Sequence, residues 1–218
     1  MKNKFLDFTK EVFTGKSIGR ILFNWRVQEH CRELRGVCVD LAAGSNPSYY
    51  RYWNLKKEQV IRVDYKKKEG VNMVADLNRE LLFKDNYADN VFLFNAIYII
   101  EQPEKLLKEI YRILKPGGVF FFNPPLINNE APEPHDYFRL TSEGIEKILF
   151  QTRFSQMELY KIGERATAAA SLLHNFWMFN FVRFFVFGLA LFLDRLIPKK
   201  TKKKYPAPMA YFVISKKL

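Results

Sequence analysis

Reactive and metal-binding residue types are scarce in this sequence. Its 218 residues include two cysteines, Cys31 and Cys38, and three histidines, His30, His135 and His174. Because these residues are so few and show no spacing typical of a metal site, we predict neither a disulfide framework nor a bound metal. The N-terminal segment has charges throughout and no apolar run of the secretory type. We therefore predict no signal peptide and a reducing, cytoplasmic setting.

Acidic residues are almost missing from the C-terminal fifth of the chain. Residues 176–218 contain nine lysines and arginines but one acid, Asp194, and so carry +8 of the formal net charge of +12. Such an imbalance indicates an anionic partner for this part of the chain, either a nucleic acid or an anionic membrane surface.

The hydrophobic residues follow an alternating pattern of strands and helices. Short apolar runs predict strands, and apolar residues repeating at three and four positions predict the helix Glu104–Leu114. This alternation is typical of an α/β fold with a parallel sheet and helices on both faces. The predicted strands are Gly36–Leu41, Glu58–Tyr65, Val71–Ala75, Asp89–Ala96, Val119–Asn123, Phe154–Ile162 and 208–215, and further helices are predicted at Ser48–Leu55 and Thr141–Phe150.

The chain divides into three segments. Residues 1–35 predict one or two amphipathic helices with a break at Gly15–Ser17, and these helices would either cap the sheet or form a lid over a pocket. Residues 36–163 together with 208–218 form the predicted α/β domain. Residues 164–207 form an apolar and basic helical insertion before the last strand.

The ends of the first two strands form a candidate ligand site. The stretch Gly36–Pro47 reaches Asp40 and then breaks into small residues, among which Gly44 can adopt positive φ and leave room for a ligand. Asp64 ends the second strand, where an acid binds ribose hydroxyls in nucleotide-binding sheets. The sequence therefore predicts a nucleotide-like ligand at this edge of the sheet.

The order of these motifs resembles a known family. Asp40-x-Ala-Ala-Gly44, then Asp64, then Asp76-Leu77, and then the run from Ile99 to Gly118 with RILKPGG are similar to the class I S-adenosylmethionine-dependent methyltransferases. The resemblance covers about residues 36–163 and extends to 208–215. It implies a three-layer, Rossmann-like, seven-stranded and mostly parallel sheet whose last strand is antiparallel.

The resemblance also implies roles for individual residues around S-adenosylmethionine. Asp40, Ala42 and Gly44 would line the methionine and ribose part of the cofactor. Asp64 would bind the ribose hydroxyls, with Tyr65 beside the adenine. The remaining implied positions are Asp76 at the adenine amino group, Leu77 against the ring, and Asn95 at the border of the methyl-transfer cavity.

Several positions depart from the family pattern. The family usually has glycine where this chain has Ala42, and a methyl group there is compatible with the turn if φ is negative. Gln102 stands where many members have histidine. The triplet Asn123-Pro124-Pro125 resembles the catalytic motif of amino-group methyltransferases but follows the fifth strand instead of the fourth, so we interpret it as the start of a loop.

The loop 124–140 holds the candidate catalytic residues. A hydroxyl acceptor must lose a proton during methyl transfer, and a histidine or carboxylate can take it. We predict His135 as this base, Asp136 as its partner or alternative, and Tyr137 as a pocket wall. The other interpretation of His135 is an exposed loop residue.

The insertion allows three interpretations. Residues 171–197 predict an apolar helix, followed by a lysine run, so that 176–204 could lie in the interface of an anionic membrane. The same helix could instead be buried in the core or in a homodimer interface. A membrane span is disfavoured because the last strand must return to the same sheet.

Together these observations predict an S-adenosylmethionine-dependent methyltransferase. The predicted reaction is O-methylation of a small-molecule, glycan or lipid-linked acceptor, by a cytoplasmic protein peripheral to the inner membrane face. Two alternatives stay open. One is a nucleic-acid methyltransferase that uses the basic C-terminal run, and the other is a non-catalytic binding protein that retains the fold.

Overall fold

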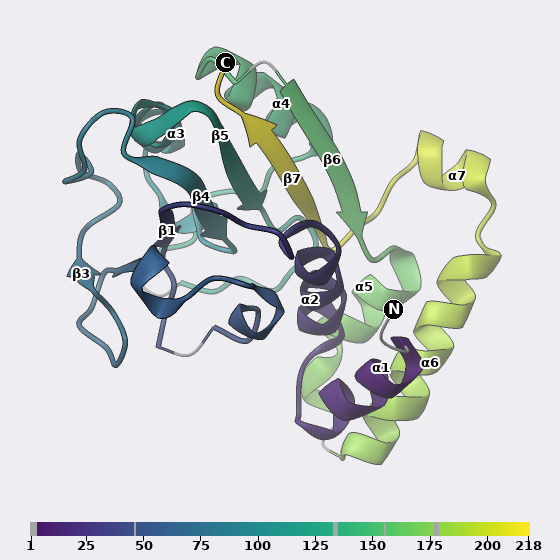
Figure 1. The fold of residues 1–218 in the computed structure, drawn as a ribbon. Coiled ribbons are helices and arrows are strands. Elements are labelled where there is room, and N and C mark those ends of the chain that lie inside the picture. The colour runs from purple at the N-terminus through teal and green to yellow at the C-terminus, as the bar shows by residue number, and fades with distance from the viewer. Residues whose placement is uncertain (1–3, 46, 133–134, 155, 177–178) are drawn as a thin grey trace.

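A seven-stranded sheet forms the centre of the computed structural model, which describes residues 4–45, 47–132, 135–154, 156–176 and 179–218 (Figure 1). The strand order is β3-β2-β1-β4-β5-β7-β6, and β7 runs antiparallel to both of its neighbours. This confirms the predicted mostly parallel sheet with an antiparallel last strand. The strands are β1 (Cys38–Leu41), β2 (Val60–Asp64), β3 (Met73–Val74), β4 (Ala88–Phe94), β5 (Leu114–Asn123), β6 (Gln156–Ile162) and β7 (Ala210–Lys216).

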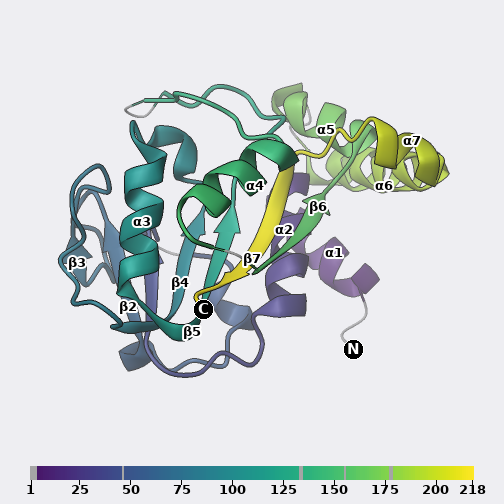
Figure 2. The same ribbon diagram turned by 90° about the horizontal axis from the view of Figure 1, so that it is seen from above.

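Helices cover both faces of the sheet (Figure 2). One face packs against α3 (Pro103–Ile113) and α4 (Ser142–Gln151), whose buried residues join the core cluster that contains Val39 and Phe120. The helix α4 begins where its sequence predicts, because the Thr141 hydroxyl accepts a hydrogen bond from the Gly144 N–H. The opposite face packs against α2 (Ile18–His30), and α1 (Lys4–Phe13) packs on α2 and on the later helix Asn180–Leu196.

The insertion folds into a helical hairpin, so the single helix predicted over 171–197 is wrong. It consists of α5 (Arg165–Leu172), a short 3₁₀ turn at His174–Phe176, α6 (Asn180–Leu196) and α7 (Lys199–Lys204). Asp194 of α6 is buried and accepts hydrogen bonds from the Ala166 N–H (2.7 Å) and the Thr167 N–H (3.1 Å). Because these N–H groups belong to the first turn of α5, Asp194 caps one helix of the hairpin from the other.

The helix predicted at Ser48–Leu55 is also wrong. The structure has 3₁₀ turns at Tyr50–Tyr52 and Lys57–Gln59 in this part of the chain. The aromatic side chains explain the difference, since Tyr49 and Tyr50 turn toward the sheet and Trp53 packs on Phe92 with ring centroids 4.4 Å apart. Tertiary contacts of this kind override the local preference for a regular helix.

Candidate functional site

The parallel strands β1, β2, β4 and β5 bring four polar side chains to one edge of the sheet. Asp40 lies near the end of β1 and pairs in register with Arg62 of β2 and Phe92 of β4. Asp64 ends β2, Asn95 directly follows β4, and Asn123 ends β5. The carboxyl ends of parallel strands are where open α/β sheets bind their ligands. The predicted site residues at these positions therefore lie at the same edge.

The turn after β1 has two residues in the left-handed region. Ala42 has φ +58° and Gly44 has φ +68°. The backbone at Ala42 is therefore strained, and the condition of negative φ, under which its methyl group would be compatible with the turn, is not met. At Gly44 an added Cβ would meet no atom of the described residues within 4 Å, so the turn is open to a ligand there. The Arg62 guanidinium holds the turn by donating to the Gly44 carbonyl at 2.8 Å.

Asp40 is completely buried beneath this turn. Its Oδ2 accepts hydrogen bonds from the hydroxyls of Tyr49 (2.8 Å) and Tyr50 (2.7 Å). Its Oδ1 has no hydrogen-bond partner among the described residues. Burial raises the pKa of Asp40 to about 7, although the two tyrosine hydroxyls and the nearby Arg62 oppose the shift. The structure thus leaves one buried acceptor atom available at the strand end.

Asp64 is held in its ionised form. Burial raises the pKa of this carboxyl, but hydrogen bonds from the Lys66 N–H, the Lys68 ammonium and the Gly44 N–H outweigh burial, so the pKa is lowered overall. The Gly44 N–H lies 2.9 Å from Oδ2, and the Lys68 Nζ lies 3.0 Å from Oδ1. Asp64 therefore joins the end of β2 to the turn after β1. Tyr65, next to it, is exposed.

The residues predicted at the adenine lie beyond β3. Asp76 is half-buried and accepts a hydrogen bond from the Asn78 N–H at 2.9 Å, which forms a local turn. Asn78 in turn accepts from the Glu101 N–H at 2.8 Å and links this turn to the segment after β4. Leu77 is buried in the core on the α3 side of the sheet.

A cavity of about 140 Å³ lies beyond the ends of β4 and β5. Asn95, which has φ +53°, forms part of the cavity wall. Its backbone N–H donates a hydrogen bond to the Asn123 carbonyl at 2.9 Å. The first turn of α2 forms another wall through Ser17, Gly19 and Arg20. Sequence reasoning missed Arg20 and treated Asn123 as a loop start. The position of Asn123 at the end of a strand parallel to β4 was the signal that could have identified it.

The candidate catalytic residues lie in the loop between β5 and α4. His135 is exposed, and its ring stacks on Tyr137 with centroids 5.2 Å apart. Asp136 forms an ion pair with Arg139, which holds the pKa of this carboxyl down at about 2. Among the described residues that line the 140 Å³ cavity, neither His135 nor Asp136 occurs. The Tyr137 N–H donates to the Tyr98 carbonyl at 2.8 Å, which joins this loop to the segment after β4.

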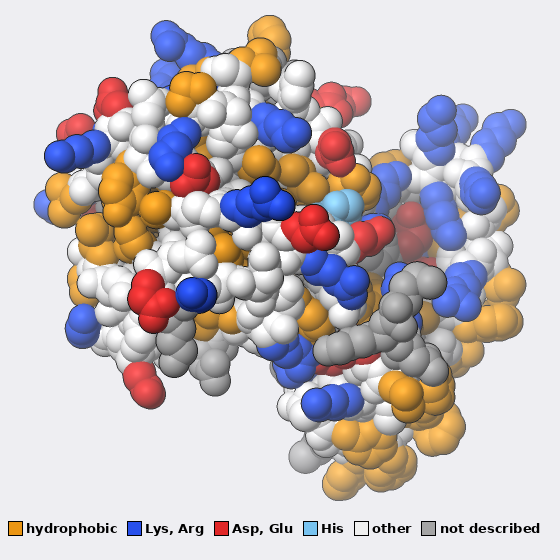
Figure 3. Space-filling view, in the orientation of Figure 1, with side chains coloured by type: hydrophobic (Ala, Val, Ile, Leu, Met, Phe, Trp, Pro, Cys, Tyr) orange, Lys and Arg blue, Asp and Glu red, His pale blue; other side chains and the backbone are white. Residues whose placement is uncertain are grey.

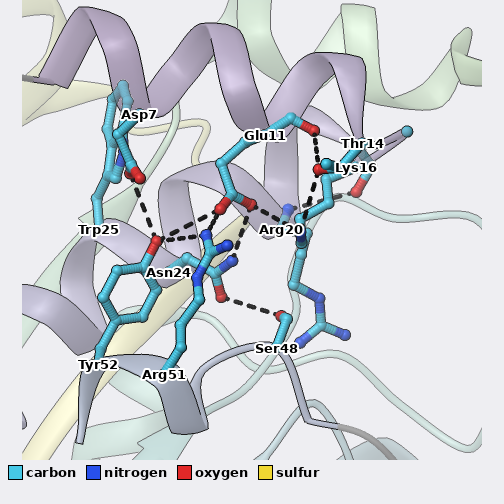
Figure 4. Close-up of polar contacts among 12 residues, drawn as sticks. Asp7, Glu11, Thr14, Lys16, Arg20, Asn24, Trp25, Ser48, Arg51 and Tyr52 are labelled. Atoms are coloured by element: carbon cyan, nitrogen blue, oxygen red, sulfur yellow. Dashed lines mark hydrogen bonds and ion pairs between the residues drawn. The ribbon is translucent and has the colours of Figure 1, made fainter.

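A buried polar network joins α1 and α2 to the segment after the β1 turn (Figure 4). Glu11 of α1 is fully buried and forms ion pairs with Arg51 and with Lys16, the latter at 3.2 Å. Its carboxylate also accepts from Asn24 of α2 at 3.3 Å. Ser48 donates in turn to the Asn24 carbonyl oxygen at 3.3 Å. The N-terminal helices are therefore fixed to the segment that follows the candidate cofactor turn.

The residues at the strand ends fit the predicted cofactor, S-adenosylmethionine. The unpartnered Oδ1 of Asp40 is a buried acceptor that a ligand amino or hydroxyl group could satisfy. Asp64 is ionised, and Gly44 leaves open space beside it. The strained Ala42 departs from this pattern, since its positive φ is a conformation that glycine adopts without cost.

Comparisons with known proteins agree with this geometry. Residues 36–122 match the family model described as a methyltransferase domain. None of the curated proteins matches the chain.

Solved structures share the fold at low sequence identity. An S-adenosylmethionine-dependent methyltransferase from Archaeoglobus fulgidus is 19% identical, with a TM-score of 0.57 over 91% of this chain and 94% of that one. Phosphoethanolamine N-methyltransferase 2 of Haemonchus contortus, in complex with S-adenosyl-L-methionine, is 19% identical with a TM-score of 0.57, over 89% of this chain and 52% of that one. The 1,6-didemethyltoxoflavin-N1-methyltransferase of Burkholderia thailandensis is 14% identical with a TM-score of 0.54, over 95% and 81%.

Proposed function

We propose that this chain, which carries a class I S-adenosylmethionine-dependent methyltransferase domain, methylates a hydroxyl group of a small-molecule, glycan or lipid-linked acceptor. The observation that supports this acceptor class is the chemistry of the 140 Å³ cavity beyond β4 and β5.

The strand ends supply the groups that would hold the cofactor. Asp64 and the open backbone at Gly44 would bind its ribose, Asp40 its polar methionine and ribose groups, and Asp76 its adenine amino group. When bound, S-adenosylmethionine supplies a methyl group already activated on a sulfonium. The protein then contributes chiefly by aligning the acceptor atom, which is an entropic contribution.

The cavity suits a neutral hydroxyl acceptor better than an amine. The polar residues that line it carry amides, hydroxyls and one guanidinium: Asn95, Asn123, Asn128, Ser17, Ser171 and Arg20. Amides and hydroxyls both donate and accept hydrogen bonds, as a hydroxyl requires. No carboxylate of the described residues lines the cavity, and Arg20 would repel a protonated amine. At 14–19% identity the solved structures share the fold with this chain, and that likeness does not extend to the acceptor.

His135 is our candidate for the base that takes the hydroxyl proton. Asp136 would be a weak base at neutral pH, because its ion pair with Arg139 keeps its pKa near 2. The hydrogen bond from Tyr137 to the Tyr98 carbonyl keeps the loop beside the end of β4.

A methyl-transfer assay tests the proposal. Labelled S-adenosylmethionine is offered with nucleotide sugars, polyprenyl-linked sugars and small amines, and we expect label on a hydroxyl-bearing member. His135→Gln should lower kcat at least tenfold and leave the affinity for S-adenosylhomocysteine unchanged, whereas His174→Gln is the matched control. Transfer to amines alone would contradict the hydroxyl assignment. Cofactor binding without transfer to any acceptor would favour the non-catalytic alternative.

A further inference from the structure

The outer face of α6 has an apolar stripe that no described part of the chain covers. Its five members are exposed by 55% or more, and they recur at intervals of three and four residues: Phe181, Phe185, Leu189, Phe192 and Leu196. They lie within an arc of about 80° on a helical wheel. The buried residues of the same helix, Phe187, Ala190 and Asp194, lie on the opposite side. The stripe is thus a second apolar face, distinct from the one that packs on the protein.

Helix α1 extends this face. Phe5 and Leu6 are more than half exposed, and the Phe5 ring contacts Phe184 of α6 with centroids 6.2 Å apart. A groove of about 590 Å³ runs between the two helices, lined by Phe5, Phe185, Leu189 and Phe192 among others. The space-filling view shows hydrophobic side chains gathered where α1 and α6 lie (Figure 3). Apolar surface of this extent indicates an interaction site.

The exposed charged side chains of the helices that form this face have one sign. In α1, Glu11 is fully buried, and Asp7 accepts hydrogen bonds from the Trp25 indole (3.0 Å) and the Tyr52 hydroxyl (3.4 Å). In α6 the single acid, Asp194, is buried against α5. Among the described residues, every acidic side chain of α1 and α6 therefore points toward the protein and away from the apolar stripe.

Basic side chains, by contrast, point outward. Arg195 lines the groove, and α7, which follows α6 directly, contributes five lysines in the sequence KKTKKK. Figure 3 shows lysine and arginine side chains gathered over the position of α7. An apolar face on helices whose exposed charged side chains are cationic complements a surface that has both acyl chains and anionic headgroups.

We propose that α1, α6 and α7 form a docking face for an anionic lipid bilayer, in which the apolar stripe enters the acyl boundary and the α7 lysines contact headgroups. In this arrangement the docking helices lie along the bilayer surface and do not cross it. Among the described residues no helix has the length and apolarity to cross a membrane.

The docking face lies next to the acceptor cavity. The Asn180 amide at the start of α6 donates to the Phe13 carbonyl at the end of α1, at 3.1 Å, and Arg183 donates to the Gly15 carbonyl at 3.2 Å. The chain then enters α2 through Ser17, which lines the cavity together with Ser171 of α5. Docking would therefore bring the cavity beside the bilayer, and this favours a lipid-linked hydroxyl as the acceptor. That part of the inference rests on the proposed function, whereas the docking itself does not.

Vesicle flotation tests the docking face. We expect the full chain to float with equimolar phosphatidylcholine and phosphatidylglycerol, to float much less with phosphatidylcholine alone, and to be released by salt. Phe185→Ser with Phe192→Ser should weaken partitioning at least tenfold. The matched control is Phe150→Ser with Leu82→Ser, which are more exposed, at 78% and 76%, and lie away from this face. Lys200→Gln with Lys203→Gln should weaken vesicle binding about fivefold for each lysine. The matched control is Lys105→Gln with Lys108→Gln on α3, which should leave vesicle binding unchanged.

Specific outcomes would overturn the proposal. The proposal would be wrong if the protein floated equally with and without phosphatidylglycerol, or if it floated with neither vesicle. It would also be wrong if the control variants bound vesicles as weakly as the docking-face variants. If the protein is a dimer that the Phe185 and Phe192 substitutions dissociate, the face binds a second copy instead. Tighter binding to duplex nucleic acid than to vesicles would show that the α7 lysines bind nucleic acid instead of lipid headgroups. Titration with S-adenosylhomocysteine should give the same affinity in all of these variants, so a failure of docking can be distinguished from a failure of the proposed function.

Discussion

The strained turn at Ala42 gives a quantitative prediction. Ala42 has φ +58°, where an L-residue places its Cβ close to the following carbonyl oxygen, at a cost of about 1–2 kcal/mol. Ala42→Gly removes this strain. Glycine also increases the entropy of the unfolded chain, which costs about 0.4–1 kcal/mol, and the half-buried methyl group is lost. We expect the free energy of unfolding to rise by about 0.5 kcal/mol.

A neighbouring alanine isolates the backbone contribution. Ala43→Gly also removes a methyl group and adds glycine entropy, but Ala43 is not among the described residues with positive φ. This variant should lose about 1 kcal/mol or more, because Ala43 is buried and relieves no strain. The difference between the two variants should therefore be about 1–2 kcal/mol in favour of Ala42→Gly. Gly44→Ala should lose about 1 kcal/mol, since φ there is +68°.

Urea unfolding followed by circular dichroism measures these differences at equilibrium. If Ala42→Gly is as destabilising as Ala43→Gly, the left-handed conformation at position 42 is refuted. A fall in stability for Ala42→Gly with a rise for Gly44→Ala would contradict the whole description of the turn.

Two further predictions concern buried carboxylates. Because the pKa of Asp40 is raised to about 7 in the folded state and is near 4 when unfolded, the folded state binds more protons between these values. Its contribution to stability should therefore fall, by up to about 1.4 kcal/mol per pH unit, as the pH rises from 4 toward 7, and should level off above 7. Urea unfolding of the wild type and of Asp40→Asn across this range checks the sign, and equal slopes would contradict it. Arg51→Met should destabilise the protein by about 2 kcal/mol, because it leaves Glu11 buried with Lys16 as its remaining cation. Combining it with Glu11→Gln should recover part of that loss in a double-mutant cycle, and strictly additive losses would show that the pair is not coupled.

Local patterns in the sequence predicted most of the sheet and its helices. The apolar runs gave β1, β4 and β7 to within a few residues, and the spacing of apolar residues identified α3. The family resemblance supplied the number of strands and the antiparallel last strand. The start of α4 was predictable because its cap is local, with the Thr141 hydroxyl accepting from the Gly144 N–H three residues on.

Features that depend on distant residues were not predictable. The predicted helix after β1 failed because Tyr49 and Tyr50 bind Asp40, which no local pattern reveals. The positive φ of Ala42 is set by its place in the folded turn. The cavity combines Arg20 with Asn123, which are far apart in the sequence and meet only in the fold. The Asp136–Arg139 ion pair has a spacing of three residues and could have been anticipated.

Isothermal titration with S-adenosylhomocysteine tests the central claim, that the ends of β1 and β2 hold this cofactor. We predict one binding site per chain with micromolar affinity. Asp64→Asn should weaken it at least tenfold, since this ionised carboxylate would bind the ribose. Asp85→Asn, an exposed carboxylate paired with Arg112, is the matched control and should leave the affinity unchanged. Absence of binding at high micromolar ligand, or equal affinity for Asp64→Asn and the wild type, would contradict the account.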